Sequence, residues 1–493
     1  MQKITNQQET IIISAILFLI VFFGGFMRLY QLGYSSYWID EGFTLMQVRG
    51  IVQYGYPLLD SGFMEWKDVL IPYITAPFVK FFGFEYKWLL RLPSAIFGIL
   101  TIFVGYHLAV NMFSRYTGLM FAFFIASCHW YIAWSQQVRG YSAVMFFVLL
   151  LFYFLSRYER TTMMRYVTYA FISIICAVLA KKFAIILFVP FLVYIFSKKL
   201  YKLFLIFIIP SIIVSVFFVH IARDSLVINS LNYFYFYISE YLFSYFGIFF
   251  ILSLIGFICA NLFVKKPNSL HASIALFVVI SILVFSLFIF VSERRYLLMV
   301  TPFLFLYTAY FIECVARRFK YKLIVGILIF VGVISISIIY KNSTILVAKK
   351  HYVLEYYTPQ PNYDKAYEEI IERGFSNEDI IISANPYMDI IYLGRANYAI
   401  PWSLTGRGDD TTMGLEREFH SGARKIYGKG RVTGLDKIIS LQKKGNVYVV
   451  LDSLSSRRMK FDLWDDITDI GDKIFTDGDT HSVTVYVFPK INL

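Results

Sequence analysis

Long apolar runs separated by short basic segments dominate the first 340 residues. A helix needs about 20 mostly apolar residues to cross about 30 Å of hydrocarbon. The pattern predicts eleven membrane-spanning helices, although the region 166–197 also fits one hairpin or a broken helix. The predicted spans are residues 10–27, 91–110, 117–134, 141–156, 166–181, 183–197, 203–221, 242–263, 272–291, 296–314 and 323–340. We therefore expect a polytopic α-helical membrane domain over residues 1–340.

The pattern changes after residue 340, where helix-like and strand-like pieces alternate. The predicted helices are Asp364–Arg373 and Gly434–Lys444, and the predicted strands are Asp379–Ala384, Asn446–Asp452 and Ser482–Phe488. Gly-rich stretches at 406–408 and 428–430 are typical of loops. Such an alternation predicts a soluble α/β domain over residues 341–493.

Composition supports a membrane protein and argues against a soluble enzyme or a disordered chain. The chain is 58% apolar and 16% charged, with a mean hydropathy of +0.61, whereas soluble domains are about 45–50% apolar and about 25% charged. The net charge of +13 resides before residue 341, because the tail holds 20 Lys and Arg against 21 Asp and Glu. The basic residues lie in short loops, which indicates membrane orientation rather than a nucleic-acid partner.

The distribution of basic residues predicts the orientation. With the N-terminus in the cytoplasm, the inner segments hold 14 basic and two acidic residues, as the positive-inside rule requires. An odd number of spans then places the tail outside the cytoplasm. The first apolar run is followed by no small-residue cleavage site, so we expect an uncleaved helix. A bacterial inner (plasma) membrane is the simplest setting.

The segment between the first two spans, residues 28–87, is much longer than the other loops and carries carboxylates. Asp40 and Glu41 follow the first span closely and lie among aromatic residues. A carboxylate held near apolar groups has a raised pKa and can accept a proton from a nucleophile, so this pair is the candidate catalytic site. Asp60, Glu65 and Asp68 are candidate substrate-binding residues, for which a solvated loop is the competing interpretation.

Several basic residues lie on the predicted outer side of the membrane, although the positive-inside rule places most basic residues on the cytoplasmic side. Arg binds phosphate oxygens through two hydrogen bonds and Lys acts as a point charge, so these residues are candidates for a lipid phosphate. Contact with ordinary lipid headgroups is the competing interpretation. The candidates are Arg139, Lys181, Lys182, Arg294 and Arg295. Isolated histidines and the four cysteines, all in apolar runs, show no metal-ligand spacing.

Four motifs in one order carry a family resemblance. They are Trp38–Glu41, then Arg91–Gly98 (RLPSAIFG), then Ser135–Tyr141 (SQQVRGY), then Arg294–Leu298 (RRYLL) with Pro302. Over about residues 25–310, the chain resembles the GT-C class of membrane glycosyltransferases, in particular the protein O-mannosyltransferase and lipid A aminoarabinose transferase (PMT-like) superfamily. The family often has Glu where this chain has Gln137, and the tail carries no matching motif.

The resemblance implies transfer of a sugar from a polyprenyl-phosphate donor to a glycan, lipid or protein hydroxyl at the outer membrane face, with inversion. Asp40 would be the base or would orient the acceptor, and Glu41 would support it. The outer cations, Arg139 foremost, would stabilise the leaving phosphate. The motifs add Arg91, Gln136, Tyr141 and Tyr296 as candidate substrate-binding residues. The sequence establishes no cofactor, and the resemblance leaves open a divalent metal, Mg²⁺ or Mn²⁺, held by Asp40 and Glu41.

Other functions compete with this interpretation. A transporter or flippase for a lipid-linked glycan would need ionisable residues near mid-span and related halves, and the sequence shows little of either. A non-catalytic envelope protein would explain the tail but not the acidic first loop. A polymerase or oligosaccharide transferase of related fold would move a glycan chain instead of one sugar.

Overall fold

The computed structural model describes residues 6–222, 232–262, 269–287, 294–339, 361–400, 430–452, 461–477 and 483–491. The chain divides into two compact units. The helical unit comprises Met1–Tyr30, Lys67–Ile71 and Arg91–Lys349, and the sheet unit comprises Gln31–Trp66, Pro72–Leu90 and Lys350–Leu493. Most of the predicted first loop thus groups with the C-terminal part. The domain boundary predicted at residue 341 lies outside the described residues and stays a prediction.

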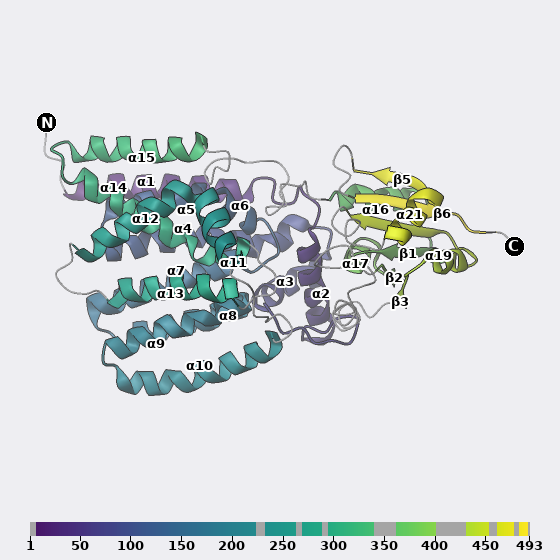
Figure 1. The fold of residues 1–493 in the computed structure, drawn as a ribbon, viewed down its shortest axis with the longest axis horizontal. Helices are drawn as coiled ribbons and strands as arrows, with labels where there is room; N and C mark the ends of the chain where they lie inside the picture. Colours follow the sequence, from purple (N-terminus) through teal and green to yellow (C-terminus); the bar gives the residue numbers. More distant parts are fainter. Residues whose placement is uncertain are drawn as a thin grey trace. The chain divides into compact units, whose positions relative to one another are not determined.

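The helical unit is built from apolar helices of different lengths, and the longer ones run side by side (Figure 1). They are α1 (Asn6–Leu29), α4 (Lys87–Met112), α5 (Arg115–Ser127), α6 (His129–Ser135), α7 (Tyr141–Thr161), α8 (Arg165–Ala180), α9 (Phe188–Ser197), α10 (Tyr201–Ala222), α11 (Asn232–Tyr235), α12 (Ser244–Leu262), α13 (Ser269–Leu287), α14 (Thr301–Ala316) and α15 (Lys322–Ile339). Helical segments of 3₁₀ or π geometry are η1 (Lys182–Leu187), η3 (Phe236–Phe243) and η4 (Arg294–Met299). The prediction of a helical membrane domain is therefore confirmed.

Each predicted span coincides with helical residues, but the lengths vary. Among the described residues, five helices are long and apolar enough to cross a membrane: Gln7–Leu29, Lys87–Met112, Tyr141–Thr161, Phe236–Leu262 and Ser269–Leu287. The remaining predicted spans correspond to apolar helices of 10–17 residues or to broken ones. The predicted span 117–134 is broken at Cys128, between α5 and α6. The count of eleven membrane crossings stays a prediction.

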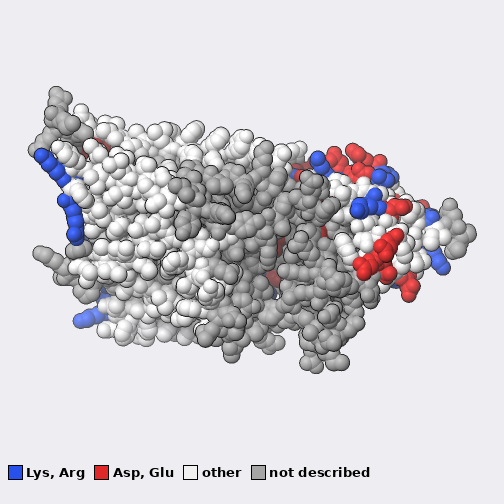
Figure 2. Space-filling view, turned by 45° about the horizontal axis from the view of Figure 1, so that its top comes forward, with Lys and Arg blue, Asp and Glu red and all other residues white. Residues whose placement is uncertain are grey.

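Large apolar side chains cover the outside of the helical unit. Phe18 on α1, Ile213 on α10 and Leu328 on α15 are each more than 60% exposed. Soluble proteins rarely expose so much apolar surface to water, whereas a protein embedded in a bilayer presents such a surface to the lipid chains. Figure 2 shows a broad uncharged band on this unit with Lys and Arg gathered at one end. The surface fits a protein embedded in lipid.

The sheet unit contains a six-stranded sheet in the order β3-β2-β1-β4-β6-β5. Strands β3 (Gly430–Arg431), β2 (Tyr398–Ala399), β1 (Ile380–Ser383) and β4 (Val447–Asp452) are parallel. Strands β6 (Val483–Phe488) and β5 (Asp472–Thr476) continue the sheet in antiparallel pairing. Both β1 and β4 are buried along their whole length, which explains their continuous apolar sequences.

Helices complete the C-terminal part of this unit. They are α16 (Tyr363–Glu372), α17 (Pro386–Leu393), α19 (Leu435–Gln442) and α21 (Phe461–Ile470). Ile438 of α19 and Ile467 of α21 enter the same apolar cluster as side chains of β1, β4 and β6, so these two helices cover one face of the sheet. The two helices and three strands predicted from the tail sequence correspond in residue range to α16, α19, β1, β4 and β6.

About half of the first predicted loop is helical, which the sequence did not predict. It contains α2 (Ile39–Tyr54) and α3 (Leu70–Phe82). The helix α2 lacks a clean apolar stripe, because buried positions along it include Glu41, Thr44 and Gln47. Its burial comes from partners distant in the sequence, and a periodicity argument cannot detect such partners.

Candidate functional site

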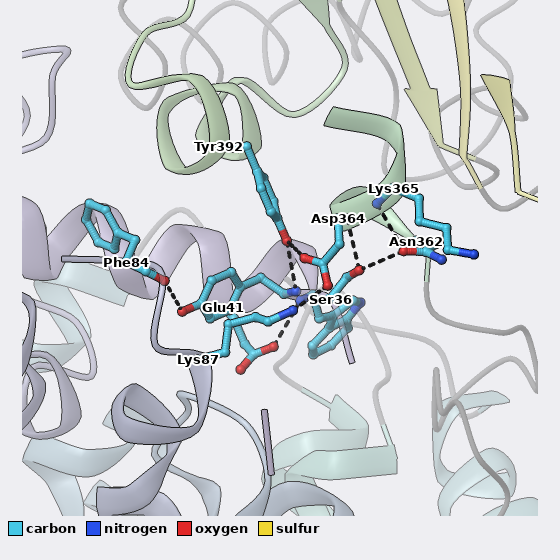
Figure 3. Close-up of polar contacts among 10 residues, drawn as sticks. Ser36, Glu41, Phe84, Lys87, Asn362, Asp364, Lys365 and Tyr392 are labelled. Carbon is cyan, nitrogen blue, oxygen red and sulfur yellow. Dashed lines mark hydrogen bonds and ion pairs between the residues drawn. The ribbon is translucent and has the colours of Figure 1, made fainter. Parts of the chain in front are cut away.

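The acidic pair of the first loop begins α2. Asp40 and Glu41 are in the first turn of this helix, where its dipole favours negative charge. The backbone N–H of Trp38 donates to Oε2 of Glu41 at 2.9 Å, which is one half of a capping box (Figure 3). Glu41 is fully buried and Asp40 is half-buried. Glu41 thus fixes the start of the helix, and Asp40 is the more accessible carboxylate.

The next two acidic candidates have local structural partners. Asp60 forms an exposed ion pair with Arg49 at 3.2 Å. Glu65 is buried; its backbone N–H donates to the carbonyl of Pro57 at 2.9 Å and its carbonyl accepts from Gln47 Nε2 at 3.0 Å. These contacts fold the segment after α2 back onto the helix. Both contacts are made by the Glu65 backbone, and the role of its carboxylate stays a prediction.

Asp68 joins the cations in the helical unit. Its Oδ2 accepts from Nζ of Lys181 at 2.6 Å, and its Oδ1 accepts from the backbone N–H of Lys182 at 2.9 Å. Burial alone would raise the pKa of the Asp68 carboxyl, but the charges of Lys181 and Arg139, with these hydrogen bonds, hold the pKa below its usual value. The sequence predicted Asp68 as a substrate-binding residue, whereas the structure brings it to the predicted phosphate-binding cations.

Aromatic rings line the same group of cations. Nζ of Lys181, a residue only 2% exposed, lies 4.4 Å from the centroid of the Tyr141 ring. The Tyr141 and Trp134 rings are 4.4 Å apart, and Cζ of Arg295 lies 5.8 Å from the Trp134 ring. Aromatic faces stabilise cations in a site of low polarity. We call Arg139, Lys181 and Arg295 the cation cluster, next to which Lys182 contributes its backbone N–H to Asp68.

The backbone around Arg139 is held tightly between α6 and α7. The carbonyl of Arg139 accepts from Ser94 Oγ at 3.0 Å, and Ser142 Oγ donates to the carbonyl of Ser94 at 2.8 Å. A Cβ on Gly140 would lie 2.1 Å from the carbonyl oxygen of Ala180. Only glycine allows this approach, which brings the half-buried Arg139 next to the end of α8, where Lys181 follows.

Two residues position this loop by capping helices, and the sequence analysis missed one of them. Gln136 Nε2 donates to the carbonyls of Met27 and Tyr30, at the end of α1, at 3.1 and 3.0 Å. Arg28, fully buried, donates in turn to the carbonyls of Ile125 and Ala126, at the end of α5, at 3.0 and 3.2 Å. Each side chain satisfies carbonyls that a helix end leaves unpaired. Because Arg28 ends an apolar span, nothing in its local sequence distinguishes it from a residue at the membrane surface.

The other motif residues have different surroundings. Arg91 is buried in α4. Tyr296, half-buried in η4, packs its ring 5.5 Å from Phe183 and 5.7 Å from Phe285, so its ring contributes to packing near the cation cluster. Arg294 begins η4.

The acidic pair does not make a metal site with its described neighbours. Among the described residues, no three His, Cys, Asp or Glu side chains gather closely enough to hold a metal ion, and Glu41 already accepts a hydrogen bond from the backbone. Mg²⁺ and Mn²⁺ prefer several oxygen ligands. We therefore derive no step through a metal.

The candidate residues thus fall into two groups. The sheet unit contains four of the acidic candidates, Asp40, Glu41, Asp60 and Glu65. The helical unit contains the other candidates, which are Asp68, Arg91, Gln136, Arg139, Tyr141, Lys181, Lys182, Arg294, Arg295 and Tyr296. The structure brings Asp68 to Lys181 and Lys182. The juxtaposition of Asp40 with the cation cluster remains a prediction.

Comparisons with known proteins support the resemblance seen in the sequence. Residues 67–223 match the family model described as dolichyl-phosphate-mannose-protein mannosyltransferase. No protein of curated function matches the chain in a sequence search.

Solved structures share the fold over nearly the whole chain. ArnT from Cupriavidus metallidurans matches in the apo state with a TM-score of 0.60 and 12% identity, covering 98% of each chain. The same protein bound to undecaprenyl phosphate matches with a TM-score of 0.58, 12% identity and 98% of each chain. The oligosaccharyltransferase AglB from Archaeoglobus fulgidus, in complex with an inhibitory peptide and a dolichol-phosphate, matches with a TM-score of 0.54 and 12% identity, covering 98% of this chain and 75% of AglB.

Proposed function

Because the chain has the fold of the PMT-like GT-C glycosyltransferases and matches their family model over residues 67–223, we propose that it is an integral-membrane glycosyltransferase. It moves a sugar from a polyprenyl-phosphate donor to an acceptor hydroxyl on the outer face of a cell membrane. The acceptor is a glycan, a lipid or a protein. The solved ArnT complex with undecaprenyl phosphate supports this class of donor.

The observation that carries the proposal is the cation cluster. Lys181 is almost completely buried, and a buried ammonium group is costly without anionic partners. Asp68 supplies one negative charge, while Arg139 and Arg295 bring further positive charge to the same aromatic surroundings. Such a group of cations suits a phosphate, whose charge grows as it leaves the sugar.

The transfer step follows from the chemistry of the donor. The acceptor oxygen attacks the anomeric carbon as the bond from that carbon to the phosphate oxygen breaks. The bonding electrons leave with polyprenyl phosphate, which the cation cluster stabilises, and the acceptor proton passes to Asp40. Attack opposite the leaving group inverts the anomeric configuration. Glu41 holds Asp40 in place by fixing the first turn of α2.

Oligosaccharide transfer is the second candidate reaction. It is favoured by the similarity to AglB, although the chain spans only 75% of that protein. The same proton and phosphate chemistry would apply, with a glycan chain in place of one sugar. The size of the product distinguishes the two reactions.

The proposal is tested with purified protein in lipid nanodiscs. Radiolabelled polyprenyl-phosphate sugars and polyprenyl-diphosphate oligosaccharides are supplied separately, each with an extract of membrane acceptors. We expect label to move from the lipid to an acceptor, and the polyprenyl-phosphate donor to raise the melting temperature. If no lipid-linked sugar stabilises the protein or loses its label, the proposed function is wrong.

A further inference from the structure

The loop that precedes the acidic pair is attached to the C-terminal part of the chain. Ser36 Oγ accepts from the backbone N–H of Asp364 at 3.1 Å and donates to Oδ1 of Asn362 at 3.3 Å. Asn362 is the N-cap of α16, so Ser36 joins the hydrogen bonds at the start of that helix. Figure 3 shows these contacts around the start of α2.

The carboxylate of Asp364 is the centre of this attachment. It forms a close ion pair with Nζ of Lys87, the first residue of α4, and accepts from the hydroxyl of Tyr392 at 2.6 Å. The Tyr392 hydroxyl in turn accepts from the backbone N–H of Tyr37 at 3.4 Å. All of these groups are at most half-exposed, so solvent screens the ion pair only partly. Asp364 thereby connects residues on both sides of the acidic helix α2.

A second contact fixes α2 immediately after the acidic pair. A Cβ on Gly42 would lie 3.2 Å from Cε of Met388 on α17, and the Phe43 ring meets the Tyr387 ring edge-on at 5.8 Å. Met46, one turn later, is buried in an apolar cluster with Tyr387 and Ile390. The residues that flank Asp40 and Glu41 on both sides therefore contact the C-terminal part.

We propose that Asp364 and Lys87 are positioning residues that hold the catalytic carboxylate of Asp40 through the loop 36–38. The C-terminal part thus acts as a scaffold for the start of α2, a role that its own sequence does not indicate. The effect on the transfer rate rests on the proposed function, whereas the positioning of the loop does not. A catalytic group displaced by about 1 Å can lose about a hundredfold in rate, so a modest shift of this loop has a measurable effect.

The experiment compares Asp364→Asn, Lys87→Met and their double variant, each in the full chain in nanodiscs. Asp364→Asn keeps the size of the side chain and removes the charge. We expect each single variant to lower kcat by about tenfold while donor binding changes less than about twofold, because the cation cluster is untouched. The double variant should be no slower than the worse single variant, since both remove one interaction. Asp364→Glu should restore part of the rate.

Hydrogen exchange supplies a readout that does not depend on activity. In Asp364→Asn, amides of residues 36–46 should exchange faster than in the wild type. The control is Glu369→Gln on the same helix, which breaks an exposed ion pair with Arg373 and should change neither rate nor exchange. The inference would be overturned if Asp364→Asn left hydrogen exchange at residues 36–46 unchanged. It would also be overturned if the wild type were active and Asp364→Asn had the same kcat. If no donor supports transfer even in the wild type, the proposed function fails, while faster exchange would still establish the positioning.

Discussion

Lys181 shows how a single buried charge can reveal a binding site. Its ammonium group pairs with Asp68 and lies over the Tyr141 ring, yet it stands beside further cations. From the sequence, Lys181 was one basic residue at the end of a span, and an ordinary lipid headgroup explained it equally well. Its burial against an aromatic ring comes from contacts between distant segments, which no local pattern contains.

We predict that Lys181→Met weakens binding of polyprenyl phosphate by about tenfold or more, because a charge-assisted hydrogen bond contributes about 1.5–3 kcal/mol. Asp68 would then also repel the ligand. The affinity is measured by titrating a short-chain polyprenyl phosphate into labelled protein. Lys199→Met, at an exposed position after α9, serves as the matched control. Equal affinity in the two variants would contradict the assignment of the phosphate site.

Asp389, in the sheet unit, is a second buried ionisable residue. Burial raises the pKa of its carboxyl to about 7, although hydrogen bonds from Ser383 and Tyr367 act in the opposite direction. The folded chain therefore keeps a proton that the unfolded chain releases near pH 3.8. Stability falls as the pH rises between these two values and stays at the lower level above them.

We therefore predict that Asp389→Asn, which cannot ionise, reduces the difference in melting temperature between pH 5 and pH 8. In the wild type, this group makes the protein less stable at pH 8 than at pH 5. Differential scanning fluorimetry in nanodiscs measures both proteins at both values. The same pH dependence in variant and wild type would show that Asp389 does not retain its proton in the folded state.

At the scale of elements, hydropathy predicts where apolar helices lie and only some of the places where they break. The interruption at Cys128 falls inside the predicted span 117–134, whereas the break between α8 and η1 agrees with the boundary predicted between the spans 166–181 and 183–197. The first is stabilised by Arg28 at the end of α5, and the second places Lys181 and Lys182 against Asp68. These breaks form the candidate site, and they depend on tertiary hydrogen bonds.

Gly140 allows a direct test of the approach between α7 and α8. We predict that Gly140→Ala destabilises the helical unit and weakens phosphate binding, because its Cβ would meet the backbone carbonyl of Ala180. Overpacking of this kind costs about 1–3 kcal/mol. Gly247→Ala on α12 is the control, since nothing lies within 4 Å of its Cβ. If both variants melt and bind alike, the close approach does not exist in solution.

For the whole molecule, the sequence predicted the membrane class, the superfamily resemblance and the main elements of the tail. It did not predict that the acidic first loop forms helix α2 and packs on α17 in the sheet unit. The reason is physical: Met46 and Tyr387 are separated by more than 300 residues, and each alone is an ordinary apolar residue. The distribution of charged residues along the sequence predicts only the orientation of the chain in the membrane.

The predicted orientation can be measured with introduced cysteines. Ser440→Cys on α19 should react with a membrane-impermeant maleimide in intact spheroplasts, whereas Met163→Cys between α7 and α8 should react only after permeabilisation. Both positions are exposed in the structure. The wild type, in which Cys128 is buried and the other three cysteines are half-buried, gives the background. Reversed labelling would place the sheet unit in the cytoplasm and exclude transfer at the outer face.

The central claim is that Asp40 accepts the proton of the acceptor while other residues bind the donor. The most direct measurement is the transfer rate of Asp40→Asn together with its affinity for the donor lipid. General base catalysis contributes about 10²–10⁴-fold, so the account predicts a loss of that size in kcat with donor affinity unchanged. Full transfer activity in Asp40→Asn would contradict the account.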